Sequence, residues 1–493
     1  MKKKYFIGFF AVLLIFGLAL PPLFIHFLKK ELYKQAEENT IFNISLGEVS
    51  VELFPLSILL DDARITTNPA DSSSSFPQLD VKFPAISLKQ ISLWSYLLDE
   101  QIQVGTLNLS PASVQVNFTA DTSSLFDSLS CLLSLQTSNL SFDKKHPENI
   151  QLENHQLSIT QLKTNTSDGF YSFTLEELKS EGKEQLQLEM SGLNMTPNYS
   201  KAEFAQRKKY QTEQAKLFIE KAIFTDFNLA KAIKEKYIDL SSIQFQGLNL
   251  ELFRDKHYPR KPNQFKPLPQ AILRNLPWKF AIGNTEFANS FLQYEELIKE
   301  AENPGSLFFE SINANILNIT NDSLVNPSGK FSMKAKADFM GEGKLDVAFN
   351  FDMFREDNQF DFSGSLSTMS LTSINPILEN IALVHIESGK MEKMDFFITA
   401  DESQSIGNLH FYYSDLKAKH LPPTSHANAN IFKKVLFDLM ESMLIPKENL
   451  AGKKFRKGKV NFQRDKEKSI VNYWWKSIFS GLKSTVGIKK PAQ

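Results

Sequence analysis

Apolar and polar side chains alternate along most of this chain, as in the segment 104–118. Within that segment Leu107, Leu109, Val114 and Val116 are separated by Asn, Ser and Gln. A period of two predicts a strand with one apolar and one polar face. Further alternating runs occur at 44–65, 83–88, 102–118, 156–162, 170–178, 184–195, 242–253, 308–320, 329–339, 343–353, 360–371, 392–400 and 407–416. Because turn residues separate many of these runs, the pattern predicts a meander of antiparallel strands.

The apolar faces of so many strands need a cover. If the face of a strand with four inward apolar side chains remains exposed to solvent, roughly 6–12 kcal/mol of stabilisation from burial is lost. Amphipathic helices that could cover these faces are few in the sequence. Two covers therefore remain open: a second sheet, as in a sandwich or barrel, or an apolar ligand such as lipid chains held on the concave side of a curled sheet.

Helical periodicity is confined to a few segments. It predicts short helices within 91–102 and at 225–238, the latter with Asp226 as its N-cap, and a longer helix at 428–445. The segment 254–277 contains five prolines and is predicted to be a loop or linker between β-rich regions.

The N-terminus carries the signal of a membrane anchor. Three lysines precede an apolar run from Tyr5 to Leu28, and about 20 apolar residues suffice to cross a bilayer as a helix. The run is longer than the apolar region of a secretory signal peptide, although "GLA" at 17–19 leaves cleavage open as an alternative. Either case predicts that the rest of the chain is exported.

The C-terminal segment differs from the rest in charge. Residues 447–493 contain thirteen Lys and Arg against three acidic residues, whereas the whole chain has a formal charge of −1. Within 469–487 the apolar spacing predicts an amphipathic helix. The helix contains Trp and Tyr residues and is flanked by lysines, which suits a membrane interface. The alternative is a helix docked on the protein's own sheet. The membrane-interface candidates are Trp474, Trp475, Ile478, Phe479, Leu482, Lys476 and Lys483.

Composition supports a folded chain but no recognisable catalytic chemistry. Hydrophobic residues make up 42% and charged residues 23% of the chain, and Cys131 is the single cysteine. The eight histidines show no metal-binding spacing, and neighbouring carboxylates on a strand point to opposite faces. We therefore expect no catalytic residues, no metal, no cofactor and no nucleic-acid partner.

Several blocks of the sequence resemble AsmA-like proteins of the bacterial envelope. The resemblance covers "ISLGEVSVELFPLSILLDDARI" at 44–65, the block at 83–118 that ends in "VGTLNLSPASVQVNF", and the blocks at 276–322 and 374–421. It implies an inner-membrane anchor, a periplasmic location and an elongated, open β-structure whose apolar groove conducts phospholipid toward the outer membrane, as in bridge-like lipid transfer proteins. It implies no catalytic residue. The chain is shorter than the large bridging members of that family.

These observations combine into one expected architecture. We expect a mainly β protein in which an N-terminal transmembrane helix precedes an elongated, curled antiparallel sheet with an open apolar groove, a few short helices and a C-terminal amphipathic helix. The expected regions are 1–30 (anchor), 31–253 (β-rich), 254–277 (linker), 278–427 (β-rich) and 428–493 (helical and basic). The lipid-groove candidates are Leu107, Leu109, Val114, Val116, Phe245, Leu248, Leu250, Val347, Phe349 and Phe351.

The expected function is non-enzymatic. The partners would be phospholipid and the inner membrane, with outer-membrane or other envelope proteins in addition. The competing hypothesis is a scaffold or assembly factor for outer-membrane proteins, which would use sheet edges for strand pairing.

Overall fold

The structure is a computed structural model of the chain. It describes residues 25–27, 29–30, 32–34, 42–67, 77–92, 95, 101–118, 124–143, 153–183, 185–422, 446–452 and 454–486. The predicted transmembrane run lies almost wholly outside these residues, and so do the predicted helix at 428–445 and most of the segment 91–102. No helix within the described ranges has both the length and the apolar character needed to cross a bilayer.

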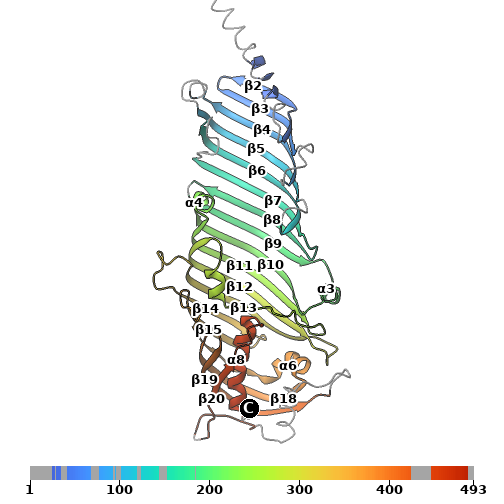
Figure 1. Cartoon of the computed structure of the whole chain (residues 1–493), viewed down its shortest axis with the longest axis vertical. Coiled ribbons are helices and arrows are strands. Elements are labelled where there is room, and N and C mark those ends of the chain that lie inside the picture. Colours follow the sequence, from blue (N-terminus) through green and yellow to red (C-terminus); the bar gives the residue numbers. More distant parts are fainter. Residues whose placement is uncertain are drawn as a thin grey trace, which may run out of the picture. The chain divides into compact units, whose positions relative to one another are not determined.

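The described strands belong to one twenty-stranded sheet that is mostly antiparallel and not closed (Figure 1). This confirms the mainly β fold. The prediction of an uninterrupted antiparallel meander is wrong at one place, because β11 (Tyr237–Asp255) and β12 (Lys279–Leu297) are parallel. The long connection between these strands returns the chain to the end where β11 began, so the next strand runs in the same direction.

The chain divides into two compact units, residues 1–190 and 191–493, and the division falls within β9 (Leu186–Pro197). Every element with assigned bounds in the first unit is a strand, and successive strands from β2 to β8 pair antiparallel. They are β1 (Phe42–Ser45), β2 (Glu48–Leu53), β3 (Leu56–Thr67), β4 (Gln78–Ile91), β5 (Gln101–Asn117), β6 (Phe126–Asp143), β7 (Asn154–Thr166) and β8 (Tyr171–Gly182).

The second unit combines strands with several short helices and one longer helix near the C-terminus. The proline-rich segment 254–277 lies inside this unit and includes α5 (Pro269–Arg274). The other elements are α3 (Lys201–Lys208), β10 (Glu213–Phe227), α4 (Leu229–Glu235), β13 (Gly305–Thr320), β14 (Lys330–Phe339), β15 (Gly343–Asp352), β16 (Phe360–Leu366), β17 (Met369–Ser370), a 3-10 helix (Leu371–Ile374), α6 (Asn375–Ala382), β18 (Val384–Ala400), β19 (Gln404–His420), β20 (Gly458–Gln463) and α8 (Ile470–Thr485).

The helix predicted at 225–238 is shorter in the structure. It begins after Asn228, whose side chain accepts a hydrogen bond from the backbone N–H of Lys231 at 2.8 Å. Asp226 is therefore not the N-cap; it belongs to β10 with a positive φ of 59°. The apolar residues before it extend the strand, because they pair in register with β11.

The hydrophobic core of the second unit lies between α8 and strands β14 to β20. Its buried members include Phe349, Phe362, Ile398, Leu409 and Val460, of which Ile398 and Leu409 are fully buried. Stacked phenylalanines dominate one part of it, with ring centroids of Phe349 and Phe362 5.6 Å apart. The buried residues of this cluster begin at Leu268, so the cluster belongs to the second unit.

Candidate functional site: an apolar trough and the helix that covers its end

One face of the first unit is apolar from strand to strand. Residues directly opposite each other in an antiparallel pair lie on the same face of the sheet. Leu109 lies opposite Ile86 on β4 and Leu135 on β6. Val114 lies opposite Val81 and Cys131. The same face also carries Leu56, Ile58, Leu60, Ala63, Ile65, Leu79, Phe83, Leu88, Val104, Leu107, Ala112, Val116, Leu129, Leu133, Leu157, Ile159, Leu162, Leu175 and Leu178.

A β-bulge keeps the apolar residues of β5 on this face. The pairing shifts between Leu109 and Ala112, so that Ser110 and Pro111 on β5 oppose a single residue of β6. The shift explains why apolar residues change from odd positions before the bulge to even positions after it. Proline is tolerated at a bulge because no ladder hydrogen bond from its nitrogen is needed. All four groove candidates on β5 therefore share one face.

Irregular pairing recurs at neighbouring positions along the first unit. Asp62 on β3 and Gln161 on β7 have positive φ values of 56° and 54°, and the register of β6 with β7 shifts between Ser130 and Leu132. Bulges bend a strand and increase its twist. A row of bulges that crosses adjacent strands therefore favours a curved sheet, with the apolar side chains on its concave face.

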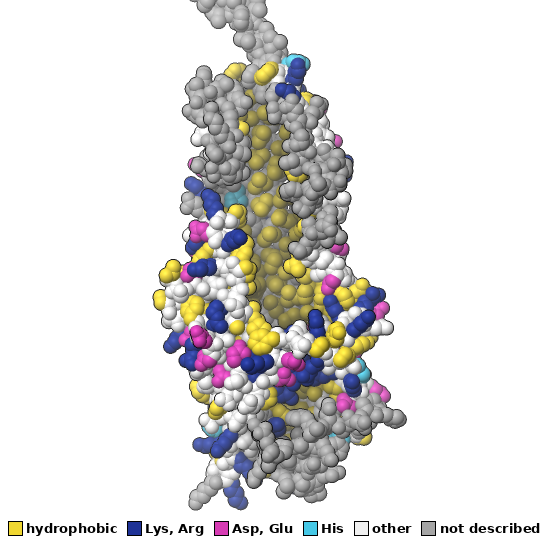
Figure 2. All heavy atoms as spheres, viewed as in Figure 1, with side chains coloured by type: hydrophobic (Ala, Val, Ile, Leu, Met, Phe, Trp, Pro, Cys, Tyr) yellow, Lys and Arg dark blue, Asp and Glu magenta, His cyan; other side chains and the backbone are white. Residues whose placement is uncertain are grey.

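This apolar face has little cover within the described part of the first unit. Leu107, Leu109, Val114 and Val116 are only half-buried, although their neighbour Ala112 is fully buried. Figure 2 shows hydrophobic side chains gathered in a hollow over these strands. We call this concave apolar face the trough.

The main ladder of the second unit also has one apolar face, and the name trough is used for this face too. One row of opposed residues passes from β10 to β20 and stays on one face throughout. It consists of Ala222, Phe245, Phe287, Ala314, Ala335, Val347, Gly364, Phe396, Leu409 and Gly458. The ring centroids of Phe245 and Phe287 are 5.0 Å apart. Leu250 lies opposite Leu217 and Leu292.

Exposure changes along this face of the second unit. On β11 to β13 Phe245, Leu250 and Phe287 are half-buried, as is the further groove candidate Leu248, which lies opposite Ile219. On β15, by contrast, Phe349 and Phe351 are each only 6% exposed. The ladder therefore presents an open stretch followed by a covered stretch.

Helix α8 is the cover of the second stretch. The rings of Trp474 and Phe349 lie 4.6 Å apart, and Trp474, Ile478 and Leu482 pack against the core. The groove candidates Val347, Phe349 and Phe351 are thus placed in or beside a packed core. The open trough contains the other seven candidates, in two stretches described separately for the two units.

The structure also separates the membrane-interface candidates into two groups. Trp474, Ile478 and Leu482 face the protein core, which corresponds to the docked-helix alternative. Trp475 is 43% exposed and stacks on Phe479 at 5.9 Å. Lys476 and Lys483 lie over the Phe479 ring at 5.6 and 5.4 Å.

The deepest face of α8 is lined by small and polar residues, with Tyr473, Ser477, Gly481 and Thr485 buried at intervals of four. Ser477 Oγ lies 2.7 Å from Ser405 Oγ on β19. The spacing of apolar residues alone does not identify this face. Small side chains allow the helix to approach the strands closely.

Enlarging Gly481 should loosen this contact. A Cβ atom there would lie 2.9 Å from Leu409 Cβ and 3.0 Å from Val460 Cγ2. We expect Gly481→Val to lower the free energy of unfolding by about 1–3 kcal/mol through overpacking. Urea titration of the full chain measures this. Val471→Leu, at a position that is 62% exposed on the same helix, is the control and should change stability by less than about 0.5 kcal/mol.

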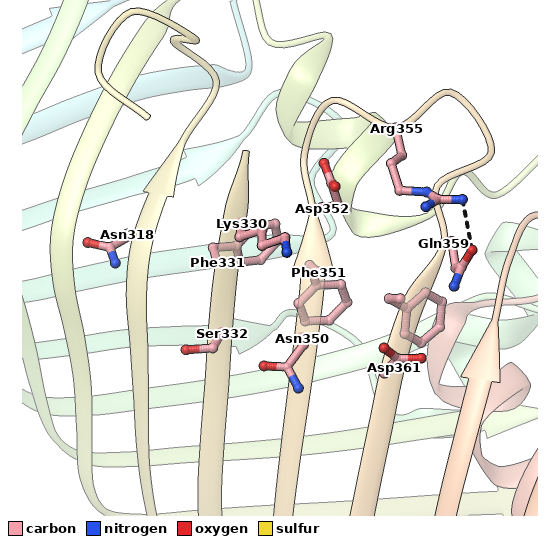
Figure 3. A pocket seen from close by; sticks show the side chains of 11 residues that line it. Asn318, Lys330, Phe331, Ser332, Asn350, Phe351, Asp352, Arg355, Gln359 and Asp361 are labelled. Carbon is pink, nitrogen blue, oxygen red and sulfur yellow. Dashed lines mark hydrogen bonds between the residues drawn. The ribbon is translucent and has the colours of Figure 1, made fainter. Parts of the chain in front are cut away.

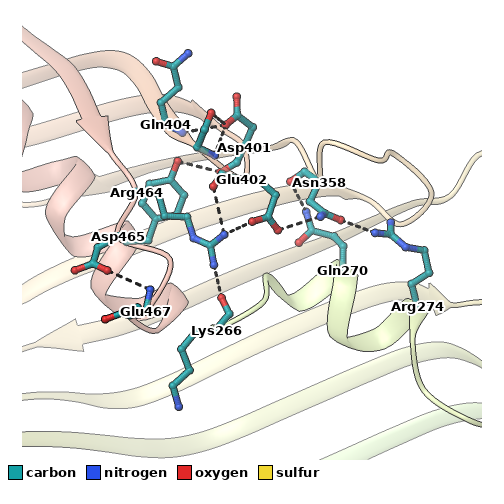
Figure 4. A network of polar contacts seen from close by, with 12 residues as sticks. Lys266, Gln270, Arg274, Asn358, Asp401, Glu402, Gln404, Arg464, Asp465 and Glu467 are labelled. Carbon is teal, nitrogen blue, oxygen red and sulfur yellow. Dashed lines mark hydrogen bonds and ion pairs between the residues drawn. The ribbon is translucent and has the colours of Figure 1, made fainter. Parts of the chain in front are cut away.

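A polar network ties the end of β20 to the segment that follows β11 (Figure 4). The Arg464 side chain is fully buried and donates hydrogen bonds to a Glu402 carboxylate oxygen and to the Lys266 carbonyl. Glu402 also accepts a hydrogen bond from Asn358 Nδ2 at 3.0 Å. Arg274 in α5 donates to Asn358 Oδ1 at 3.0 Å. The network thereby connects the end of β20, which α8 follows in the chain, to the segment that contains Lys266 and α5.

A separate hollow of about 550 Å³ lies near the ends of β14 to β16 and is mainly polar (Figure 3). Ser332, Asn350 and Asp361 are in register with one another and alternate with the phenylalanines of the core. Arg355 at its edge is held by Asp357 and donates a hydrogen bond to Gln359 at 2.8 Å. The lining of this hollow offers little apolar surface for lipid chains.

Lys476 on α8 is a partly buried lysine whose pKa differs from that of an exposed lysine. Its pKa is lowered to about 8, first by burial and then by the nearby charges of Lys468, Lys256 and Lys483, whereas Glu296 opposes the shift. The folded protein therefore binds fewer protons at this site than the unfolded chain between about pH 8 and the ordinary lysine pKa.

Stability should respond to pH accordingly. Because the unfolded state binds more protons in this range, the contribution of Lys476 makes the free energy of unfolding rise as pH increases from about 8 to 10. We expect Lys476→Met to raise the free energy of unfolding at pH 7. We also expect the variant to lose the part of the rise between about pH 8 and 10 that Lys476 contributes. Chemical unfolding at several pH values measures it. The exposed Lys336→Met is the control, and parallel curves for wild type and Lys476→Met would contradict the prediction.

Comparison of the chain with protein families, with curated proteins and with solved structures finds no match. The site is therefore interpreted from its own geometry. Its defining features are a half-buried apolar concave face, a polar opposite face and a helix that covers one end.

Proposed function

We propose that the chain binds lipid acyl chains in the trough and conducts or holds phospholipid without covalent chemistry. The observation that supports this proposal is the exposure change along one face. Apolar residues of one row of opposed positions are buried where α8 covers the sheet. Residues of the same row are only half-buried on β11 to β13. An apolar ligand would complete the burial that α8 provides elsewhere.

The energetics suit reversible binding. Removing a CH₂ group from water contributes about 0.8 kcal/mol, so one acyl chain of sixteen carbons contributes on the order of 10 kcal/mol. A bilayer offers the acyl chain a similar apolar environment. A lipid could therefore pass between membrane and trough with a small net change in free energy, while its headgroup stays near the wet margin.

Because several sequence blocks resemble AsmA-like proteins, we propose that this activity belongs to a bacterial envelope. On that basis the chain is proposed to be anchored in the inner membrane, with most of it in the periplasm, and to contribute to outer-membrane lipid homeostasis. The proposal assigns the trough no catalytic residue, so its specificity would come from shape and from charges at the margins.

The test combines lipid extraction with site-specific crosslinking. Full-length protein is purified beside a mock preparation, and extracted lipids are identified by mass spectrometry. A photo-crosslinking amino acid is placed at Leu109 on the trough face and, as a matched control, at Asn108 on the opposite face. We expect stoichiometric phospholipid and crosslinks at position 109 but not at 108.

Two results would overturn the proposal. Equal crosslinking at both positions would show that lipid associates without regard to the trough. A folded protein that retains no lipid and copurifies with an outer-membrane protein would instead favour the scaffold hypothesis.

A further inference from the structure

Three segments of the second unit meet at the margin of the sheet where β11 and β12 begin and β13 ends (Figure 1). The segments are 229–239, which includes α4, 276–279, and 321–330, the turn between β13 and β14. The backbone N–H of Lys279 donates to the Lys236 carbonyl at 3.2 Å, and Lys279 Nζ lies 3.2 Å from Asp322 Oδ1. Asn321 Nδ2 donates to the Trp278 carbonyl at 3.0 Å. These contacts hold the three segments side by side.

Each segment exposes large apolar side chains at this margin. We give the name apolar margin to the six of them: Leu229, Ile233, Leu276, Trp278, Leu324 and Val325. The least exposed of them, Trp278, is 40% exposed, and the most exposed, Leu324, is 85% exposed. Single exposed apolar residues are ordinary on a protein surface. A group gathered from three contacting segments instead indicates a binding surface.

The local structure holds these side chains outward. Leu229 and Ile233 are four residues apart and lie on one side of α4, whereas the residue that the helix buries is Ala232. In the turn, Asp322 is buried and its side chain accepts a hydrogen bond from the backbone N–H of Leu324 at 3.2 Å. The exposure of the apolar margin therefore follows from how the helix and the turn are built.

The same three segments are basic. Together they contain five lysines and three acidic residues, whereas the whole chain has a formal charge of −1. Two of the carboxylates pair with lysines of these segments, since Asp239 lies 2.7 Å from Lys231 and Asp322 is paired with Lys279. A surface that combines protruding aliphatic side chains, a tryptophan and an excess of lysine is complementary to a bilayer with anionic headgroups.

The apolar margin adjoins the open stretch of the trough. Its segments begin or end β11, β12 and β13. These are the strands on which Phe245, Leu250 and Phe287 are half-buried. Because an acyl chain loses its apolar surroundings whenever it crosses water, a bilayer held against this margin would shorten the path between membrane and trough.

We propose that the apolar margin inserts into the surface of a bilayer that contains anionic phospholipid, and that lipid passes there between the bilayer and the open stretch of the trough. This inference rests on the proposed function and adds to it the place of membrane contact. Trp278 and Leu324 would enter the interface between headgroups and acyl chains, while the surrounding lysines would face the phosphates.

Quenching of a fluorophore by nitroxide-labelled lipid reports such contact at single positions. Full-length Cys131→Ala protein is labelled at Leu324→Cys or, as a matched control, at Ile406→Cys, an exposed apolar position on β19. Each protein is incorporated into vesicles of phosphatidylcholine with or without phosphatidylglycerol. With phosphatidylglycerol present, we expect quenching of about half the emission at position 324 and less than about a tenth at 406. Added salt should weaken the contact at 324.

A second set of variants tests the apolar contribution. The label is moved to Ile233→Cys, and Leu324→Ser is combined with Val325→Ser. Quenching at position 233 should fall at least about threefold, because two exposed apolar side chains no longer insert. Phe397→Ser, which removes an apolar side chain as exposed as Val325, is the control and should leave it unchanged. All the replaced side chains are exposed, and thermal unfolding verifies that the fold is retained.

The outcomes separate this inference from the proposed function. If position 324 is not quenched while lipid still crosslinks at Leu109, the inference fails and the proposed function stands. If lipid crosslinks at neither place, both fail. Equal quenching with and without phosphatidylglycerol would overturn the role of the lysines. A label at 324 that is shielded without quenching, in a protein that runs as a dimer, would show that a second copy covers the apolar margin instead.

Discussion

Leu109→Asp is expected to weaken lipid binding by at least about 100-fold. Leu109 lies at the centre of the trough face of the first unit, between Ile86 and Leu135 on the adjacent strands. An ionised carboxylate against acyl chains costs several kcal/mol when nothing compensates its charge, and about 2.8 kcal/mol already corresponds to a factor of 100. Titration with a fluorescent phosphatidylcholine measures the change.

The neighbouring residue provides a matched control. Asn108→Asp introduces the same charge one position away, on an exposed site of the opposite face, and should leave binding within about twofold of wild type. Leu109 is half-buried in the unliganded fold, so the substituted sheet should still form; circular dichroism and thermal unfolding verify this. If a folded Leu109→Asp protein binds lipid as wild type does, the acyl chains lie elsewhere.

Glu402→Ala is expected to have the largest effect on stability. It removes the carboxylate partner of Arg464, whose side chain is fully buried, and leaves a guanidinium without its counter-charge. Breaking a buried ion pair by removing one partner typically costs about 3–5 kcal/mol. Urea unfolding of the full chain, followed by Trp fluorescence and by circular dichroism, should show the second unit unfolding at lower denaturant concentration.

Two further variants define the origin of that effect. Asp346→Ala breaks the exposed pair with Lys336, in which the charged atoms are 3.7 Å apart, and should cost less than about 1 kcal/mol. Replacing Arg464 and Glu402 together by Met should recover most of the stability, because neither charge then remains buried. If Glu402→Ala is no more harmful than Asp346→Ala, the network does not hold β20 and α8 in place.

Much of the strand content was predictable because alternation is a local property. Within the run 44–65, β2 and β3 are joined at Phe54 and Pro55, as the break in the pattern indicates, and residues 44–45 are the end of β1. Three long strands were not among the alternating runs: β6, β10 and β12. In β10, Phe218 at a polar position and Lys221 at an apolar position interrupt the alternation, and the strand is identified only by its pairing with β11.

The faces of the strands were predictable only in part. Odd and even apolar positions in β5 belong to one face because of the bulge at Ser110 and Pro111, and Phe245 and Leu248 in β11 flank Gly247, whose φ is +62°. Glycine is favoured there because this backbone conformation is strained for residues with a Cβ atom. A period of two predicts a face only between such interruptions.

The sequence by itself determined that the chain is mainly β, that many strands have one apolar face and that its C-terminal segment contains a basic amphipathic helix. These properties depend on neighbours in the chain. The tertiary structure decided that β11 and β12 run parallel, that α8 buries a small-residue face, and that this helix covers Phe349 but leaves Phe245 half-buried. Each depends on groups far apart in sequence, because strand register and the close approach allowed by Gly458 and Gly481 decide which residues meet.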